Sequence, residues 1–207
     1  MRGCCMSDSL ITKRAMADSL KTLMKKKSLE RITVSDIVKG CGLNRQTFYY
    51  HFKDKYDLVN WIYYSEIITT LSPISDGADW SAAIMKALNI MRKDKAFYAG
   101  SLNLDGQSIL RDYLFRETRD MLIKILEKPD FQKTMNLEPD DRILIAEFYT
   151  YGLVGMVIQW VKKGMSEAPN EIVEKLSRFI DDSEWVSAVR SWAKNNSTKS
   201  LPGKQRK

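Results

Sequence analysis

A dense set of helix start signals lies at residues 33–40 and leaves little freedom in how this part of the chain folds. Thr33 is a preferred N-cap residue, and Asp36 stands three positions later, where its carboxylate can reach back as in a capping box. Ile32 and Ile37 flank the cap at the spacing of a hydrophobic staple. These signals predict a short helix with a defined first residue.

The same signals recur directly downstream. Asn44 is a preferred N-cap residue, and Leu43 and Phe48 form a second hydrophobic staple. Gly40 and Gly42 lie between the two segments, and either of them can end the first helix. Two short capped helices separated by roughly three or four residues with a glycine are typical of a helix-turn-helix.

The rest of the chain has helical periodicity, and no pair of segments reads as paired strands. Only ten glycines and five prolines occur among the 207 residues, which favours helices over a turn-rich β architecture. We therefore expect an all-α protein, with a first helix at 8–27 capped by Ser7 or Asp8. After the helix-turn-helix we expect helices at residues 56–71, 79–97, 106–128, 139–163 and 169–193.

Positive charge is concentrated at the two ends of the chain. Residues 1–60 hold 12 Lys and Arg against 6 Asp and Glu, whereas residues 61–193 hold 16 against 20. A basic segment on an acidic body indicates an anionic partner, with nucleic acid as the first candidate. We predict a flexible N-terminus at residues 1–7 and a DNA-binding helix-turn-helix domain at 8–60. A helical effector-binding and dimerisation domain is predicted at 61–193, and a disordered basic tail at 194–207.

Residue types needed for catalysis or metal binding are scarce. His51 is the one histidine, and Cys4, Cys5 and Cys41 form neither a disulfide framework nor a zinc motif. No triad or nucleophile–base pair can be drawn from this set. We expect no enzyme activity, no cofactor and no metal, and the absence of an apolar leader predicts a cytoplasmic protein.

The segment from Gly42 to Lys55, with the sequence GLNRQTFYYHFKDK, closely resembles the signature of the TetR/AcrR family of transcriptional regulators. The segment Thr33–Val38 resembles the start of the second helix of the same module. This resemblance covers about residues 8–60. It implies an all-helical homodimer with an N-terminal three-helix DNA-binding domain and a variable C-terminal domain.

The predicted second helix of the motif is then a recognition helix. Spaced at 100° per residue, Gln46 and Tyr50 point away from the core residue Phe48. Arg suits guanine, Gln suits adenine and the Thr methyl group suits thymine in the major groove. We assign base reading to Arg45, Gln46, Thr47 and Tyr50.

The resemblance also implies residues that hold DNA phosphates, and we assign this role to Thr33, Ser35, Asn44, Tyr49, His51 and Lys55. Alternatives stay open for four of the side chains in the two sets. His51 can instead stabilise a helix end, Tyr49 and Tyr50 can pack against the first helix, and Lys55 can be a solvated charge.

The most apolar window, residues 143–161, is long enough to span a membrane. Glu147 near one end and Gln159 near the other argue against a span. A nearly all-apolar helix that contains Gly152 and Gly155 instead favours close contact with a partner helix. We predict a dimer interface of Gly152, Gly155, Met156, Gln159, Trp160, Ile172, Leu176 and Phe179.

The C-terminal region resembles, less closely, that of the subgroup that includes a dihydroxyacetone-kinase operon activator. On family grounds we expect an effector pocket and assign to it Phe97, Tyr113, Phe148 and Tyr151. The expected function is a homodimeric repressor that binds a palindromic double-stranded DNA operator and leaves it when an effector binds. The alternative is a co-activator or adaptor whose C-terminal domain binds a protein instead of a small ligand.

Overall fold

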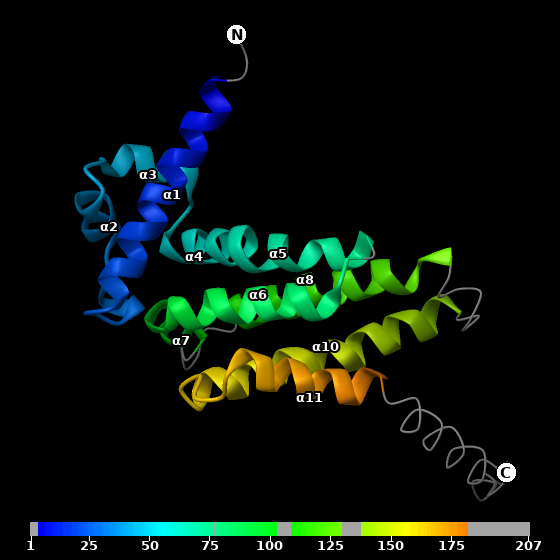
Figure 1. Cartoon of the computed structure of the whole chain (residues 1–207). Coiled ribbons are helices and arrows are strands. Elements are labelled where there is room, and N and C mark those ends of the chain that lie inside the picture. Colours follow the sequence, from blue (N-terminus) through cyan, green and yellow to red (C-terminus); the bar gives the residue numbers. More distant parts are fainter. Residues whose placement is uncertain (1–3, 77, 103–108, 130–137, 182–207) are drawn as a thin grey trace, which may run out of the picture. The chain divides into compact units, whose positions relative to one another are not determined.

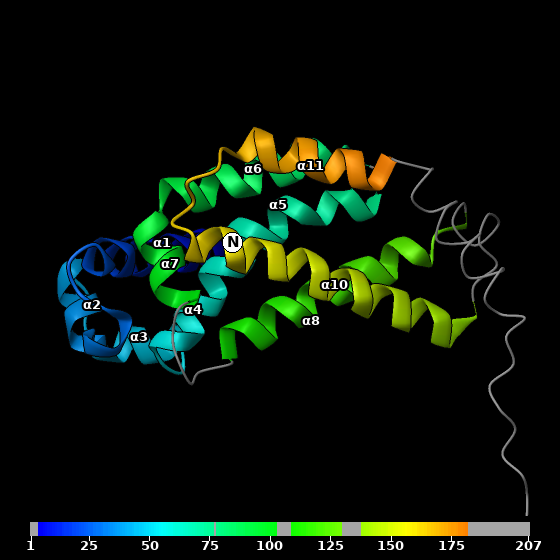
Figure 2. The same cartoon turned by 90° about the horizontal axis from the view of Figure 1, so that it is seen from below.

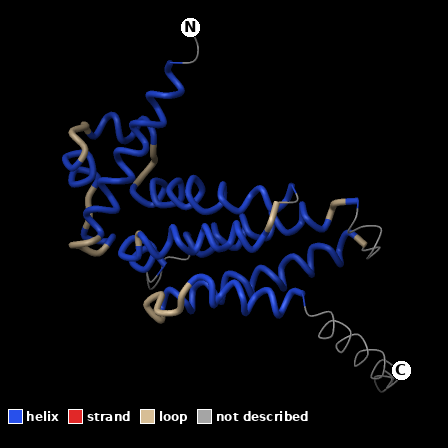
Figure 3. Tube along the Cα trace, viewed as in Figure 1, coloured by secondary structure: helices blue, strands red, loops and turns tan. Residues whose placement is uncertain are grey.

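The protein is helical throughout the part of the chain described by its computed structural model, which covers residues 4–76, 78–102, 109–129 and 138–181 (Figures 1 and 3). No strand occurs within those residues. The all-α prediction is confirmed. The tail predicted at 194–207 and the last part of the helix predicted at 169–193 lie outside the described residues.

The N-terminal elements, which we call the head, are α1 (Cys4–Met24), the 3₁₀ turn η1 (Leu29–Arg31), α2 (Val34–Gly40) and α3 (Arg45–His51). The first helix was predicted at 8–27, and both of its ends differ. It begins at Cys4 rather than after Ser7 or Asp8, and it stops at Met24. Lys25, Lys26 and Lys27 therefore follow the helix instead of forming its last turn.

A long helical segment follows the head and passes through α4 (Lys55–Tyr63), η2 (Tyr64–Ile68), α5 (Thr69–Leu71) and the 3₁₀ turn η3 (Ser72–Asp76). The prediction of one helix at 56–71 is correct in extent. It missed that η2 is a π-helical turn. Such turns are rare and frequently occur at functional sites.

The remaining described helices are α6 (Trp80–Lys93), α7 (Lys95–Leu102), α8 (Ile109–Leu126), α10 (Pro139–Lys162) and α11 (Pro169–Asp181). The single helix predicted at 79–97 is interrupted at Asp94, which ends α6 with φ −106° and ψ 39°. Proline opens both α10 and α11, where its missing N–H costs no hydrogen bond.

The chain divides into two compact units, residues 1–167 and 168–207. Within the first unit, α1 packs against α2, α4 and α7, and α8 packs along α10 (Figure 2). We call α4 to α10 the body. The predicted division between two domains at residue 60 falls inside the first unit and stays a prediction.

Lys21 of α1 connects the head to the body through a partly buried ion cluster. Its Nζ donates to both oxygens of Glu66 at 2.5 and 2.7 Å and to Asp94 Oδ2 at 2.7 Å. The hydroxyl of Tyr98 donates to Glu66 Oε2 at 2.7 Å. Glu66 lies in the π-helical turn and Asp94 at the break between α6 and α7. Three segments that are distant in sequence therefore meet at one ammonium group.

Candidate nucleic-acid interface

The start of α2 has the predicted capping box. Thr33 Oγ1 accepts a hydrogen bond from the Asp36 amide, and Asp36 Oδ2 accepts one from the Thr33 amide. The Thr33 hydroxyl also donates to Asp36 Oδ2 at 3.0 Å, and the bonds from the Thr33 amide and hydroxyl lower the pKa of the Asp36 carboxyl. Both residues of the first predicted staple, Ile32 and Ile37, are fully buried. The local prediction for this helix is confirmed.

The turn between α2 and α3 depends on Gly42. Its φ of +69° is in the left-handed region, which a side chain with a Cβ rarely adopts. The Leu43 amide donates to Val38 O at 2.9 Å and the Gly42 amide donates to Lys39 O at 3.4 Å, the two bonds of a Schellman motif. Gly42 rather than Gly40 is thus the residue that allows the turn.

Asn44 begins the recognition helix as predicted, because its Oδ1 accepts from the Thr47 amide at 2.8 Å. Phe48 is fully buried, whereas Arg45, Gln46 and Tyr50 are exposed. Tyr50 is 84% exposed, so the alternative that it packs against α1 is wrong. The helix presents the predicted polar face to solvent.

Two side chains of α3 also have partners inside the helix. The Thr47 hydroxyl donates to Asn44 Oδ1 at 3.0 Å, which leaves its methyl group as the part free for base contact. Arg45 lies over the ring of Tyr49, with a distance of 5.9 Å from its Cζ to the ring centroid. Arg45 Nη2 is also 3.5 Å from the Tyr49 hydroxyl. These contacts order the two exposed side chains along the same face.

His51 is the last residue of α3 and is half-buried. Burial, and next the positive charge of Lys13, lower its pKa below the usual value. Lys13 itself lies over the rings of Phe52 and Trp61, with Nζ 5.6 and 5.9 Å from their centroids. The imidazole is therefore neutral near pH 7 in the free protein.

Lys55 has a different environment from the one that a phosphate contact requires. Its Nζ donates to the carbonyl oxygens of Leu29, Glu30 and Ile32 at 2.8, 2.9 and 2.8 Å. An ammonium group has three N–H donors, and all three are used inside the protein. Lys55 is therefore not a solvated charge in the free protein, and its assignment as a phosphate ligand stays a prediction.

A stripe of apolar side chains on α10 is exposed. We define the α10 stripe as Leu144, Phe148, Tyr151, Gly152, Gly155 and Met156, which follow one another at three- and four-residue steps or flank that line. Phe148 is 73% exposed, Tyr151 68% and Leu144 66%. A Cβ added to Gly152 or Gly155 would meet nothing within 4 Å. Among the described residues, the side-chain positions of these two glycines are therefore open.

The other predicted dimer residues differ in exposure. Gln159 is exposed, as an interface residue of the free chain should be. Trp160 is buried and its Nε1 donates to Glu167 O at 2.9 Å, so it belongs to the core and not to an open surface. Ile172 and Leu176 of α11 are also buried within the single chain. The side chain of Phe179 lies outside the described residues.

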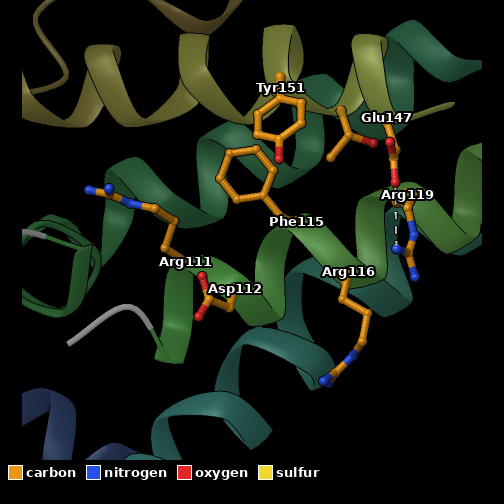
Figure 4. A pocket seen from close by; sticks show the side chains of 8 residues that line it. Arg111, Asp112, Phe115, Arg116, Arg119, Glu147 and Tyr151 are labelled. Carbon is orange, nitrogen blue, oxygen red and sulfur yellow. Dashed lines mark ion pairs between the residues drawn. The ribbon is translucent and has the colours of Figure 1, made fainter. Parts of the chain in front are cut away.

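A groove of about 510 Å³ lies between α8 and α10. Figure 4 shows Phe115 and Tyr151 facing each other across it, with their ring centroids 4.9 Å apart. Arg119 Nη1 lies 3.9 Å from Glu147 Oε1 at one end. The side chains that line the groove are Arg111, Asp112, Phe115, Arg116, Arg119, Glu147, Thr150 and Tyr151.

This groove does not match the predicted aromatic pocket. Tyr151 lines it, but Tyr113 and Phe148 do not. Phe97 is fully buried against the rings of Tyr63 and Tyr98, and so it belongs to the core of the body where α4 and α7 meet. The assignment of Phe97, Tyr113, Phe148 and Tyr151 to an effector pocket stays a prediction.

By length and composition α10 is apolar enough to cross a membrane, and 22% of its most apolar window is buried. Its packing along α8 and its acidic first turn, with Asp140 and Asp141, favour instead a helix of a folded domain. Among the described residues, no group of three His, Cys, Asp or Glu side chains lies close enough to hold a metal ion.

Two family models match the chain. Residues 18–62 match the bacterial regulatory proteins of the tetR family. Residues 78–182, about half of the chain, match a transcriptional regulator C-terminal region. The first match covers α2, α3 and the turn between them, and the second covers most of the body and α11.

Individual relatives agree with these matches. The HTH-type dhaKLM operon transcriptional activator DhaS of Lactococcus lactis is 30% identical over 93 residues, which are 45% of this chain and 50% of that protein. The match thus spans about half the length of this curated relative. Two solved structures share the fold across 82% of this chain and 94% of theirs.

The first of these structures is the dihydroxyacetone kinase operon activator DhaS, with a TM-score of 0.65 and 18% identity. The second is NalD, the secondary repressor of the MexAB-OprM multidrug efflux pump in Pseudomonas aeruginosa, with a TM-score of 0.55 and 16% identity. At these identities the likeness concerns the fold. The two similar proteins are an activator and a repressor.

Proposed function

Because this chain belongs to the TetR family of bacterial transcriptional regulators, we propose that it is a homodimeric repressor that leaves its operator when an effector binds the body. Members of this family are regulatory proteins that bind DNA and control transcription. The observation that carries the proposal is the solvent-facing side of α3, where Gln46 stands opposite the buried Phe48 and Arg45 is exposed at the edge of the same face. Such a regulator acts on DNA in the cytoplasm.

Sequence reading is assigned to the exposed face of α3. The N-terminal residues of a recognition helix reach base edges in the major groove. Arg45 can form a bidentate pair with guanine, Gln46 with adenine, and the Thr47 methyl group can contact thymine. Tyr50, one turn further along the same face, is positioned to contact the neighbouring base or sugar.

Orientation on the DNA is assigned to side chains around this face. Thr33 and Ser35 lie at the start of α2 and are exposed, and Tyr49 is exposed on α3. Asn44 and His51 stand at the two ends of α3. Contacts from such residues to phosphates position a protein without reading sequence.

The two roles separate in a mutant series on an operator selected from random duplex DNA. Arg45→Ala and Gln46→Ala should each lose about 1–3 kcal/mol of discrimination at particular base pairs. The Ser35 hydroxyl takes no part in the capping box. Ser35→Ala should therefore weaken binding to DNA of every sequence by a similar factor. Lys86→Ala on α6 is the control for loss of an exposed side chain far from the head. Uniform weakening by Arg45→Ala and Gln46→Ala would contradict the assigned face.

The dimer is assigned to the α10 stripe. Contiguous exposed apolar patches of this kind mark interaction sites, and most soluble homo-oligomers use a two-fold interface in which the same patch meets itself. A second copy of the chain would place its own α10 against Gly152 and Gly155, where the missing side chains permit close approach. Two recognition helices would then read a palindromic operator with half-sites about one helical turn apart.

Gly152→Leu tests this interface cleanly because the space around Gly152 is open within one chain. The protomer should keep its fold, while the dimer is overpacked by about 1–3 kcal/mol. Sedimentation at micromolar concentration should show more monomer, and operator binding should weaken. Asn89→Leu at an exposed position of α6 is the control. A wild type that is monomeric and binds one half-site tightly would refute the dimer.

The adaptor alternative is kept because one similar protein is named as an operon activator. A reporter gene placed behind the selected operator distinguishes the two functions. A repressor lowers transcription, and an effector restores it. An adaptor raises transcription only together with a protein partner that alters DNA binding.

A further inference from the structure

Lys55 connects two parts of the head that are separated in sequence. It is the first residue of α4, and its side chain runs back to the segment just before α2. Its three hydrogen bonds reach carbonyls 26, 25 and 23 residues earlier in the chain. The contact therefore links the beginning of α4 to the beginning of α2.

The carbonyl groups that Lys55 contacts lie at a point where the backbone has few partners of its own. Leu29 and Glu30 belong to η1, a 3₁₀ turn of three residues, and Ile32 follows it. Leu29 O accepts a backbone hydrogen bond from the Ile32 amide at 3.2 Å, and Lys55 Nζ is a second donor to the same oxygen. The other two carbonyls stand at the end of the turn, where the last carbonyls lack partners within it. Leu29 and Ile32 are also buried, so their carbonyl groups have little access to water while Lys55 covers them. Ile32 is adjacent to Thr33, the cap of α2.

We propose that Lys55 is a positioning residue for DNA binding, which holds the start of α2 in place so that Thr33 and Ser35 meet the DNA backbone, and does not contact DNA itself. This inference rests on the phosphate contacts proposed for α2. A phosphate contact by Lys55 would require it to give up three charge-assisted hydrogen bonds, which are stronger than neutral ones. Arginine cannot replace it, because a planar guanidinium does not match three carbonyls arranged around one nitrogen.

The first test uses the protein without DNA and compares backbone amide exchange at residues 29–36. Lys55→Met and Lys55→Arg should both speed exchange there by about tenfold or more, as expected for loss of hydrogen bonds to a charged group. Lys53→Met, at an exposed lysine two positions away, should leave these amides unchanged. Unchanged exchange in Lys55→Met would overturn the proposal whether or not DNA is bound.

The second test maps which phosphates of the selected operator tolerate ethylation. In Lys55→Met and Lys55→Arg, ethylation interference should disappear at the same phosphate at which it disappears in Ser35→Ala. Loss at a different phosphate that is restored in Lys55→Arg would instead show direct contact and overturn the proposal. If the interference pattern of the Lys55 variants is unchanged and only a smaller fraction of the protein binds DNA, Lys55 has a role in folding alone. That result would also overturn the proposal.

The two tests separate this inference from the proposed function. If the wild type selects no DNA sequence, the assigned reading face fails, while amide exchange still decides the role of Lys55. If the wild type selects an operator and Lys55→Met changes neither exchange nor the interference pattern, the inference alone fails.

Discussion

Replacing Lys21 with methionine should destabilise the protein more than any other single change to a charged residue proposed here. The side chain of Lys21 is 9% exposed, and methionine keeps its length and apolar stem while removing the ammonium group. Glu66 and Asp94 would then face each other across the site without a counter-charge. Tyr98 cannot supply that charge: its phenol is never cationic, and it stays neutral because burial, and next the Glu66 carboxylate, raise its pKa far above the usual value.

The size of the effect follows from burial and from the number of bonds lost. Removing one partner of a buried ion pair costs about 3–5 kcal/mol. Here the carboxylates of Glu66 and Asp94 are 30% and 24% exposed, so water recovers part of that cost. We expect about 3 kcal/mol, a large share of the roughly 5–15 kcal/mol typical of folded domains. The melting temperature should fall by about 6–12 °C.

Urea unfolding followed by circular dichroism measures this loss. Lys25→Met, at an exposed position just after α1, is the matched control and should change stability by less than about 0.5 kcal/mol. The double variant Lys21→Met, Glu66→Gln should recover part of the loss because one uncompensated charge is gone. A cost below about 1 kcal/mol for Lys21→Met, or strict additivity in the double variant, would refute the reasoning.

Three further predictions concern the head. Since the His51 pKa is lowered in the free protein and a nearby phosphate would raise it, DNA binding should take up a proton. Affinity should then increase as pH falls from about 7.5 to about 5.5, and His51→Gln should flatten that dependence in a fluorescence binding assay. Gly40→Ala would place a Cβ 2.2 Å from Ser19 Oγ, which donates to Ile37 O, and thermal unfolding should show a loss of about 1–2 kcal/mol. A plot of the logarithm of the DNA-binding constant against the logarithm of the salt concentration should have a slope of about −0.9 for each phosphate contacted. An affinity that is unchanged between roughly 50 and 200 mM salt would contradict phosphate binding.

The parts of the head that could be predicted from sequence are those made of contacts within a few residues. The caps by Thr33 and Asn44 and the turn at Gly42 join side chains and backbone groups three to five positions apart, and the residue types that make them are characteristic. The exposed face of α3 follows from helical periodicity once Phe48 is taken as the core residue. Each of these features depends on local sequence and can be predicted without the tertiary structure.

Contacts between distant segments could not be predicted in the same way. A lysine in sequence looks the same whether it is solvated or held by three carbonyls, as Lys55 is, or by two carboxylates, as Lys21 is. One signal was available for Lys21, because it falls on the apolar side of α1 next to Ala17, Leu20 and Met24. The aromatic residues carried no such signal, and the sequence did not show that Phe97 packs against Tyr63 and Tyr98.

The amino-acid sequence determined the helical class, the helix-turn-helix and the family, because these depend on local hydrogen bonds and on the period of apolar residues. Only the folded chain bound Lys55 to three backbone carbonyls, buried Trp160, opened the α10 stripe to solvent and joined Lys21 to the body. The physical reason is that burial and ion pairing depend on which segments meet in space. Lys21 and Asp94 are 73 residues apart in the chain, yet Nζ and Oδ2 lie 2.7 Å apart.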